Sequence, residues 1–175
     1  MKPGDHPEFF RMPPPPGTSR ESSLRLDREG QFWFEGDRVE HPRLLNALHA
    51  WVSRHPDDGR YILTNGYDWT YFTVDDVPFF VQSVREAEGG GLELVLTDGS
   101  ASPFTGEGLE TGDDDGLYTP VAVHGGEYEA KFTRYAQAQL APWLVEDGAG
   151  GRVGVRVGER VVVPEPRRAR GEGAK

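Results

Sequence analysis

The stretch LRLDREGQFWFEGDRVEHPRLLNALHAWVSRHPDDGRYILTN, residues 24–65, carries the pattern that decides the fold. It opens with two short runs of alternating apolar and polar side chains, residues 24–27 and 32–35, separated by a turn that contains Gly30. Alternation on both sides of a glycine-containing turn is typical of a β-hairpin. The folded part of the chain is therefore predicted to begin with a hairpin, near Ser23.

A helix is predicted directly after this hairpin. Pro42 suits its first turn, because the N–H that proline lacks would have no partner there in any helix. The segment PDDG at 56–59 ends the helix, and a strand begins at Tyr61. Between these limits the apolar side chains recur at helical spacing and form one stripe, namely Leu44, Leu45, Leu48, Trp51 and Val52.

The same order recurs in the second half of the chain. The stretch YAQAQLAPWLVEDGAGGRVGV, residues 135–155, again contains an apolar helix with a tryptophan near its end, an acidic turn with glycine, an arginine and a strand. Gly158-Glu159 then suits a two-residue turn in a closing hairpin. The second helix is predicted to place five apolar side chains on one face, namely Phe132, Ala136, Leu140, Trp143 and Leu144.

The middle of the chain is predicted to form strands. Residues 69–74, 79–84 and 92–96 are aromatic, β-branched or alternating, and Gly89-Gly90-Gly91 turns the second of these strands into the third. Residues 98–116 are rich in glycine and have no periodicity, so a long loop is expected there, and loops of that length in a compact domain are functional or mobile.

These segments predict an α+β fold, with antiparallel sheets and two helices, built from two loosely repeated hairpin–helix–strand units. The predicted parts are a Pro-rich disordered leader (1–22), an N-terminal α+β unit (23–98), a Gly/Asp-rich loop (99–116), a C-terminal α+β unit (117–165) and a basic disordered tail (166–175).

Composition excludes several classes of function. The 175 residues include 29 acidic and 19 basic side chains, a formal net charge of −10, which repels a nucleic acid. Cysteine is absent, so thiolate nucleophiles, disulfides and cysteine-ligated zinc are excluded. No apolar run is long enough to span a bilayer, and no secretory signal is recognised at the N-terminus, so a cytoplasmic protein is expected.

The stretch 24–65 resembles the opening of the bacterial DUF1285 family, in which a "DG-x-W-F" turn, a proline that leads into a helix, and "DG-x-Y-x-L-x-T" follow one another. VDDVPFF (74–80) and VGVRVGERVVVPE (153–165) are similar to later parts of that family, whereas the 98–116 loop differs. The resemblance implies a two-part α+β fold with a repeated motif and no established activity; a role in signal transduction has been suggested for the family from fold comparison alone. The matching positions in the first stretch are Gly30, Phe32, Trp33, Gly36, Pro42, Asp58, Gly59, Tyr61, Leu63 and Thr64.

No catalytic or metal motif stands out among the polar residues. Asp113, Asp114 and Asp115 are consecutive, whereas calcium loops use alternate positions, so a solvated loop is the preferred interpretation. The aromatic segment at 67–72 is predicted to be core or, if one face is uncovered, a recognition surface. The candidate ligand- or partner-binding residues are Trp69, Tyr71, Tyr67, Asp75, Asp76 and His124.

Two functional hypotheses follow. The first is a non-enzymatic binding or regulatory module for a protein or small-molecule partner, with no cofactor, which uses the aromatic strand or the 98–116 loop and which could form a homodimer. The second is a small enzyme with a site at the seam between the two units, where His124 would act with Asp75, Asp76 or Glu127. The lack of catalytic motifs favours the first.

Overall fold

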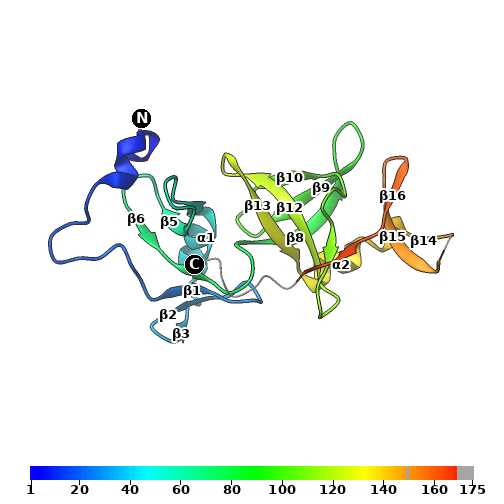
Figure 1. Cartoon of the computed structure of the whole chain (residues 1–175), viewed down its shortest axis with the longest axis horizontal. Helices are drawn as coiled ribbons and strands as arrows, with labels where there is room; N and C mark the ends of the chain where they lie inside the picture. Colours follow the sequence, from blue (N-terminus) through cyan, green and yellow to red (C-terminus); the bar gives the residue numbers. More distant parts are fainter. Residues whose placement is uncertain (149, 169–175) are drawn as a thin grey trace. The chain divides into compact units, whose positions relative to one another are not determined.

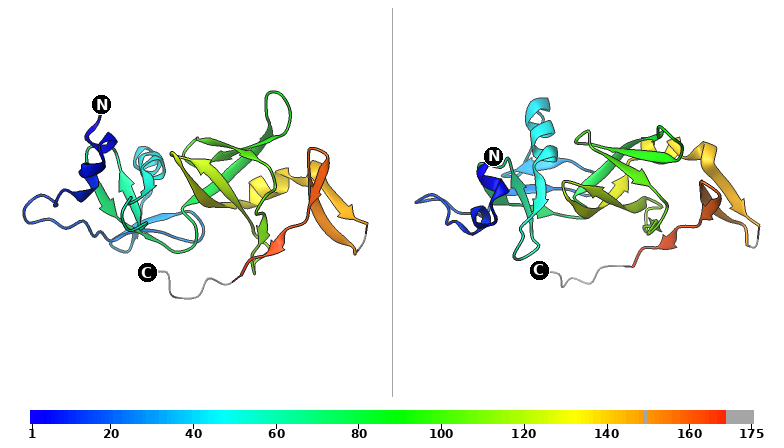
Figure 2. Two further views of the ribbon diagram at one scale, coloured as in Figure 1. Left: turned by 45° about the horizontal axis from the view of Figure 1, so that its top comes forward. Right: turned by 90° about the horizontal axis from the view of Figure 1, so that it is seen from above.

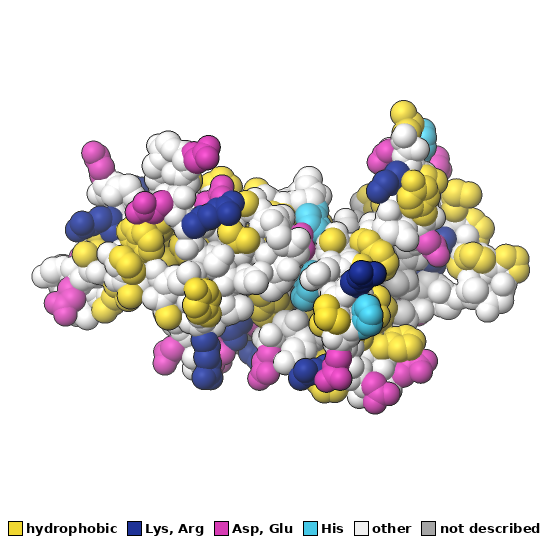
Figure 3. All heavy atoms as spheres, turned by 180° about the vertical axis from the view of Figure 1, so that it is seen from behind, with side chains coloured by type: hydrophobic (Ala, Val, Ile, Leu, Met, Phe, Trp, Pro, Cys, Tyr) yellow, Lys and Arg dark blue, Asp and Glu magenta, His cyan; other side chains and the backbone are white. Residues whose placement is uncertain are grey.

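The computed structural model describes residues 1–148 and 150–168, which fold as two units, Met1–Pro78 and a second unit that begins at Phe79 (Figure 1). Both units combine short helices with mostly antiparallel sheets, so the prediction of an α+β fold is confirmed. Neither α-helix of the described chain has the length and apolar character needed to cross a bilayer. Acidic, basic and hydrophobic side chains are interspersed over the face drawn in Figure 3.

The first unit contains two sheets and one α-helix. In the first sheet the antiparallel strands β3, β2 and β1 are joined by β7, which pairs with β1 in parallel. The second sheet is an antiparallel meander of β4, β5 and β6. The bounds are β1 Leu24–Leu26, β2 Phe32–Phe34, β3 Asp37–Arg38, α1 Pro42–Ala50, β4 Val52–Arg54, β5 Tyr61–Thr64, β6 Trp69–Tyr71 and β7 Thr73–Val74.

Two details of the first unit differ from the sequence prediction. Helix α1 begins at Pro42 as predicted but ends at Ala50, and Val52 is a buried residue of β4 that pairs with Leu63. The predicted strand 69–74 is two strands that join different sheets, on either side of the buried Phe72. Periodicity could not show this, because a β-branched or aromatic residue fits the end of an apolar stripe and the start of a strand equally well.

The leader at residues 1–22 was expected to be disordered, but its first part is folded in the structure. Two 3-10 helices, η1 Pro3–Asp5 and η2 Pro7–Arg11, lie beside β6 in both views of Figure 2. Phe9 of η2 is only 7% exposed, and its burial provides the physical reason for the order. The four prolines at 13–16 follow as a largely exposed connection to β1.

The second unit contains a seven-stranded sheet in the order β10-β9-β8-β13-β12-β11-β17 and a three-stranded sheet, β14-β15-β16. Strand pairs β8–β13 and β11–β17 are parallel, and the others are antiparallel. The bounds are β8 Phe79–Glu86, β9 Leu92–Leu96, β10 Ala101–Phe104, β11 Glu110–Thr111, β12 Leu117–Val123, β13 Gly126–Phe132, α2 Arg134–Gln139, η3 Ala141–Trp143, β14 Leu144–Asp147, β15 Arg152–Val157, β16 Arg160–Val162 and β17 Glu165–Pro166.

The predicted loop at 98–116 contains two short strands, β10 and β11, separated by turns. Strand β10 pairs with β9 at the edge of the large sheet and buries Ser102 and Phe104, while Pro103 points outward, as a proline at a sheet edge can. Strand β11 pairs with β12 and β17. The alternation at 101–104 was too short, and too close to glycine, to be recognised as a strand.

The second helix is shorter than predicted. Phe132 is the last residue of β13, and α2 begins only at Arg134, after Thr133, whose hydroxyl accepts the N–H of Ala136. Both units nevertheless show the same order of elements, an antiparallel hairpin, a helix and a three-stranded antiparallel sheet. In the first unit these are β1–β2, α1 and β4–β6, and in the second they are β12–β13, α2 and β14–β16.

Candidate functional site

An aromatic surface on the β4–β6 sheet is the candidate site, and we call it the aromatic floor. It consists of His55, Ile62, Trp69 and Tyr71. Trp69 and Tyr71 lie two residues apart on β6, so both side chains point to one face of the strand, and their rings meet edge to face at 5.1 Å. Ile62, on the neighbouring strand and opposite Tyr71, is fully buried.

His55 joins the aromatic floor from the turn after β4. Its ring centroid lies 5.0 Å from that of Trp69 and 5.7 Å from that of Tyr71, on which it stacks. Its Nδ1 accepts the backbone N–H of Asp57 at 3.2 Å, which places the imidazole proton of the neutral ring on Nε2. Nε2 is 3.0 Å from the carbonyl oxygen of Phe10, so it can donate to that carbonyl.

Two arginines cover the edges of this floor. The guanidinium of Arg20 lies 4.5 Å from the ring centroid of Trp69, and that of Arg60 lies 3.7 Å from Tyr71, both within cation–π range. Arg20 also donates to the Asp68 carboxylate at 2.7 Å, and Arg60 makes a bidentate pair with Glu21 at 2.8 and 2.9 Å. Each of these two rings therefore lies against a guanidinium that a carboxylate holds in place.

The hydroxyl of Tyr71 stays protonated at neutral pH. Burial, followed by a 2.7 Å hydrogen bond that the hydroxyl donates to Asp58, raises the pKa of Tyr71 to about 12. Burial acts to raise the pKa of Asp58, but hydrogen bonds from Tyr71 and the backbone N–H of Arg60 outweigh it and hold that pKa below its usual value. The floor therefore offers the Tyr71 hydroxyl as a hydrogen-bond donor.

Residues 2–12 lie over the aromatic floor, and we call them the N-terminal cover. Phe9 packs into the apolar cluster of Ile62 and Trp69, with Phe10 beside it. The cover is anchored at its start, where the N–H of Gly4 donates to the carbonyl of Gly66 at 2.8 Å. At its end Arg11 makes a two-point ion pair with Asp57 at 3.1 and 3.2 Å.

Two buried donors at the aromatic floor and its edge have no acceptor. The indole N–H of Trp69 and the Nε–H of Arg20 are both shielded from solvent and make no hydrogen bond in the described chain. A buried donor without an acceptor costs about 1–3 kcal/mol. The packing around Trp69 and Arg20 therefore leaves two N–H donors unsatisfied.

The structure brings together only part of the predicted site. Trp69 and Tyr71 form the aromatic floor, and Tyr67 lies at its margin, 64% exposed, with the ammonium of Lys2 5.6 Å from its ring centroid. Asp75 instead forms an ion pair with Arg25, next to strand β1, and Asp76 follows it in the chain. The sequence analysis did not identify three other residues of this site, namely His55, Phe9 and Phe10. The only signal in the sequence was the adjacent aromatic pair Phe9-Phe10 shortly before the proline run, and it says nothing of His55.

His124 is placed in the second unit, in the turn between β12 and β13, with φ +51°. Its Nε2 lies 2.5 Å from the carboxylate of Asp98, whose side chain is 3% exposed. Ser100 donates both its hydroxyl and its N–H to the same carboxylate. Ser100 thus bonds to Asp98 and not to His124, whereas in a nucleophilic triad the serine bonds to the histidine. The Asp98–His124 pair instead links the β9–β10 turn to the β12–β13 turn of one sheet.

We expect Asp98→Asn to lower the free energy of unfolding by about 1–3 kcal/mol at neutral pH. Burial acts to raise the pKa of Asp98, but hydrogen bonds from His124 and Ser100 outweigh it and leave the pKa lowered. The stabilisation of the folded state by ionised Asp98 is therefore fully present above the ordinary aspartate pKa of about 3.9. It is lost as the pH falls through the lower pKa that Asp98 has in the folded protein.

Urea denaturation across this pH range measures the effect. Wild type should lose more stability than Asp98→Asn on acidification below pH ~4. Asp113→Asn is the matched control, because Asp113 is exposed. Equal acid dependence in wild type and Asp98→Asn would contradict the assignment.

The described residues contain no group of three or more His, Asp and Glu side chains placed to hold a metal ion. The aromatic floor instead combines apolar ring faces, arginine side chains fixed by ion pairs, and unsatisfied N–H donors. Such a surface can bind an apolar segment that carries hydrogen-bond acceptors.

Comparisons with known proteins bear on the fold. No family model and no curated protein matches this chain. The crystal structure of a DUF1285 family protein from Silicibacter pomeroyi DSS-3 is similar, with a TM-score of 0.61 and 18% identity over 89% of this chain and 92% of that one. A DUF1285 family protein from Shewanella baltica OS155 has a TM-score of 0.45 and 19% identity over 66% of this chain and 87% of that one. The resemblance seen in the sequence is thus confirmed at the level of the fold, which this chain shares with the Silicibacter pomeroyi DUF1285 family protein.

Proposed function

We propose that the first unit is a non-enzymatic, regulatory peptide-binding module, and that the aromatic floor is its recognition surface. Its ligand is a short segment with two adjacent aromatic residues followed by a basic residue. The N-terminal cover has that sequence, Phe9-Phe10-Arg11, and occupies the floor as an internal ligand. Displacement of the cover by a partner segment would be the regulatory step.

The mode in which the cover binds carries the proposal. Three consecutive residues of the cover make three different kinds of contact. The ring of Phe9 fills the apolar cluster, the carbonyl of Phe10 meets Nε2 of His55, and the guanidinium of Arg11 pairs with Asp57. Side chains in a hydrophobic site, combined with a main-chain hydrogen bond and a terminal ion pair, are the elements of peptide recognition.

Exchange of the cover is favoured by its attachment. An exposed connection of four prolines, Pro13 to Pro16, links it to the rest of the unit, so it can leave without unfolding a strand. While attached it acts at a high effective concentration, of millimolar order for a short linker, and competes with any partner. A partner segment that offers an acceptor to the indole N–H of Trp69 would gain a hydrogen bond that the cover does not make.

The test uses the full chain and a fluorescent peptide with the sequence of residues 6–12, HPEFFRM. In the variant with Phe9→Ala and Phe10→Ala the cover loses its apolar contacts and the floor is uncovered. Fluorescence anisotropy should show that this variant binds the peptide about tenfold or more tightly than wild type, because the cover no longer excludes it. Phe34→Ala is the matched control, since Phe34 is 47% exposed and lies outside the floor.

Further controls distinguish specific recognition of the peptide from nonspecific hydrophobic binding. A peptide in which both phenylalanines are alanine should not bind, and Asp57→Asn in the uncovered variant should weaken binding of the natural peptide. If the double variant is unstable, Gly4→Ala provides a second route. A Cβ at Gly4 would lie 2.9 Å from Cα of Gly66, so it loosens the cover without altering the floor. A folded, uncovered variant that binds neither peptide would overturn the proposal.

A further inference from the structure

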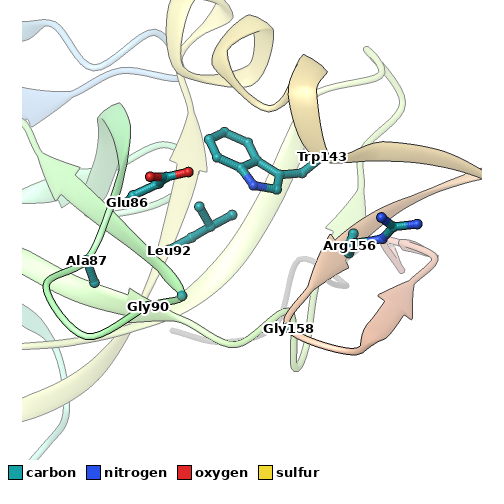
Figure 4. Close-up of a pocket in the computed structure, with 8 residues that line it drawn as sticks. Glu86, Ala87, Gly90, Leu92, Trp143, Arg156 and Gly158 are labelled. Atoms are coloured by element: carbon teal, nitrogen blue, oxygen red, sulfur yellow. The ribbon is translucent and has the colours of Figure 1, made fainter.

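A second concave site lies within the second unit, where the β8–β9 hairpin faces η3 and strand β15 (Figure 4). Its volume is about 440 Å³, within the range of pockets that hold small ligands. Buried Leu92 and the indole of Trp143 supply apolar contact area, and charged side chains stand on two different walls, Glu86 at the end of β8 and Arg156 on β15.

The polar groups of this pocket are not used by the fold. The carboxylate of Glu86, the guanidinium of Arg156 and the indole N–H of Trp143 make no hydrogen bond or ion pair with any described residue. Their neighbours behave differently, since Arg85 and Glu93 pair with each other across β8 and β9. Both charged side chains are exposed at the rim of the pocket, so they are free to pair with a ligand of complementary charge.

The walls place the charges at separate ends. Figure 4 shows the Glu86 carboxylate near the Trp143 indole, while Arg156 projects from β15 with its exposed guanidinium directed away from both. A ligand ammonium at the first end would meet both a carboxylate and an aromatic ring, a favourable combination for a cation. A carboxylate at the other end would be met by Arg156 when its exposed side chain turns toward the pocket, and a guanidinium can bind a carboxylate in a bidentate manner.

Glycines keep the pocket open. Gly90 and Gly158 lie in the two turns that border it, at φ +98° and +63°, where residues with a Cβ are strained. Their lack of side chains leaves backbone at the rim, so a ligand with its own amide groups can approach closely. These features favour an extended polar ligand over a purely apolar one.

We propose that this pocket binds a short zwitterionic molecule with the chemistry of a dipeptide. Its ammonium lies between Glu86 and the face of Trp143, its carboxylate pairs with Arg156, and its central part contacts Leu92. This site is separate from the aromatic floor, so it does not depend on the function proposed for that surface.

The experiment is isothermal titration calorimetry of the full chain with four matched probes. These are L-alanyl-L-alanine, its N-acetyl form, which has only the carboxylate, its C-terminal amide, which has only the ammonium, and free L-alanine. The unmodified dipeptide should bind about tenfold more tightly than either singly charged form, because each blocked end loses one charge-assisted hydrogen bond.

Variants then assign each end. Arg156→Gln should weaken the dipeptide about tenfold and leave the C-terminal amide unaffected, whereas Glu86→Gln should weaken the dipeptide and leave the N-acetyl form unaffected. Glu88→Gln and Arg152→Gln are the controls, since both residues are exposed and lie outside the pocket. All four positions are exposed, so the variants should fold.

NMR spectroscopy provides a second measurement of binding that does not depend on calorimetry. The indole N–H resonance of Trp143, identified by its loss in Trp143→Phe, should shift on addition of the dipeptide. Equal binding of the zwitterionic and singly charged probes, or no binding by any probe, would overturn the proposal. Binding of free L-alanine as tight as that of the dipeptide would overturn the dipeptide assignment in favour of an amino acid.

Discussion

Trp69→Ala is expected to lower the free energy of unfolding of the first unit by about 3–5 kcal/mol, as is typical of a large buried aromatic residue. The Trp69 side chain is 6% exposed and contacts the rings of Phe10, His55 and Tyr71 and the guanidinium of Arg20. Its loss would remove the centre of the aromatic floor and the seat of the N-terminal cover. Denaturation in urea, followed by circular dichroism, measures the change.

Trp69→Phe is the informative partner of this variant. A tryptophan that donates a buried hydrogen bond loses that bond when it becomes phenylalanine, but the N–H of Trp69 has no acceptor. Removal of an unsatisfied donor recovers about 1–3 kcal/mol, which offsets much of the lost contact area. Trp69→Phe should therefore cost far less than Trp69→Ala. Equal losses would show that the indole N–H does have an acceptor in solution.

Phe104→Ala is expected to lower the free energy of unfolding of the second unit by about 3–5 kcal/mol. Phe104 is 3% exposed in β10, and its ring packs edge to face on Phe132 at 5.9 Å. The substitution at Phe104 distinguishes a segment 98–116 that contains the stable strand β10 from a segment that is a mobile loop. In a mobile loop the same substitution would change stability by no more than about 0.5 kcal/mol.

Urea denaturation followed by circular dichroism again provides the measurement. Phe34→Ala is the matched control, because it makes the same chemical change at a phenylalanine that is 47% exposed in the first unit. If Phe104→Ala lowers the free energy of unfolding no more than Phe34→Ala does, residues 98–116 form a mobile loop in solution. The same comparison tests whether β10 is a stable edge of the seven-stranded sheet.

Local patterns in the sequence predicted the elements that depend on near neighbours. The hairpin around Gly30 and the start of α1 at Pro42 follow from turn chemistry and from the tolerance of a first helical turn for proline. The closing hairpin with its turn at Gly158 is also where it was predicted. The ends of both helices were wrong, because the apolar stripe continues into residues that the structure uses in strands.

Residues 69–74 show why the sheets could not be assigned. The alternation is continuous through Phe72, yet β6 pairs with β5 and β7 pairs with β1. Strand pairing depends on contacts between segments distant in the chain, which periodicity does not record. The same limit explains the predicted loop at 98–116, where β10 is held by β9 and β11 by β12 and β17.

The aromatic residues of the candidate site were found in part. Trp69 and Tyr71 stand two apart in an aromatic run, and that spacing places them on one face. His55, however, lies in a turn fourteen residues before Trp69 in the sequence, and Phe9 lies in a leader expected to be disordered. Their convergence on the floor depends on how the meander folds and on the burial of Phe9.

The sequence alone thus determined the α+β class, the acidic and cysteine-free character of the chain, and the order hairpin, helix, strand in both halves, because composition, turn residues and spacing act over a few positions. The tertiary structure decided which strands share a sheet, that Phe9 and Phe10 cover the aromatic floor, that His124 bonds to Asp98, and that Glu86, Trp143 and Arg156 border one pocket. Each of these joins residues far apart in the chain, so burial and pairing in three dimensions decide them and local propensity does not.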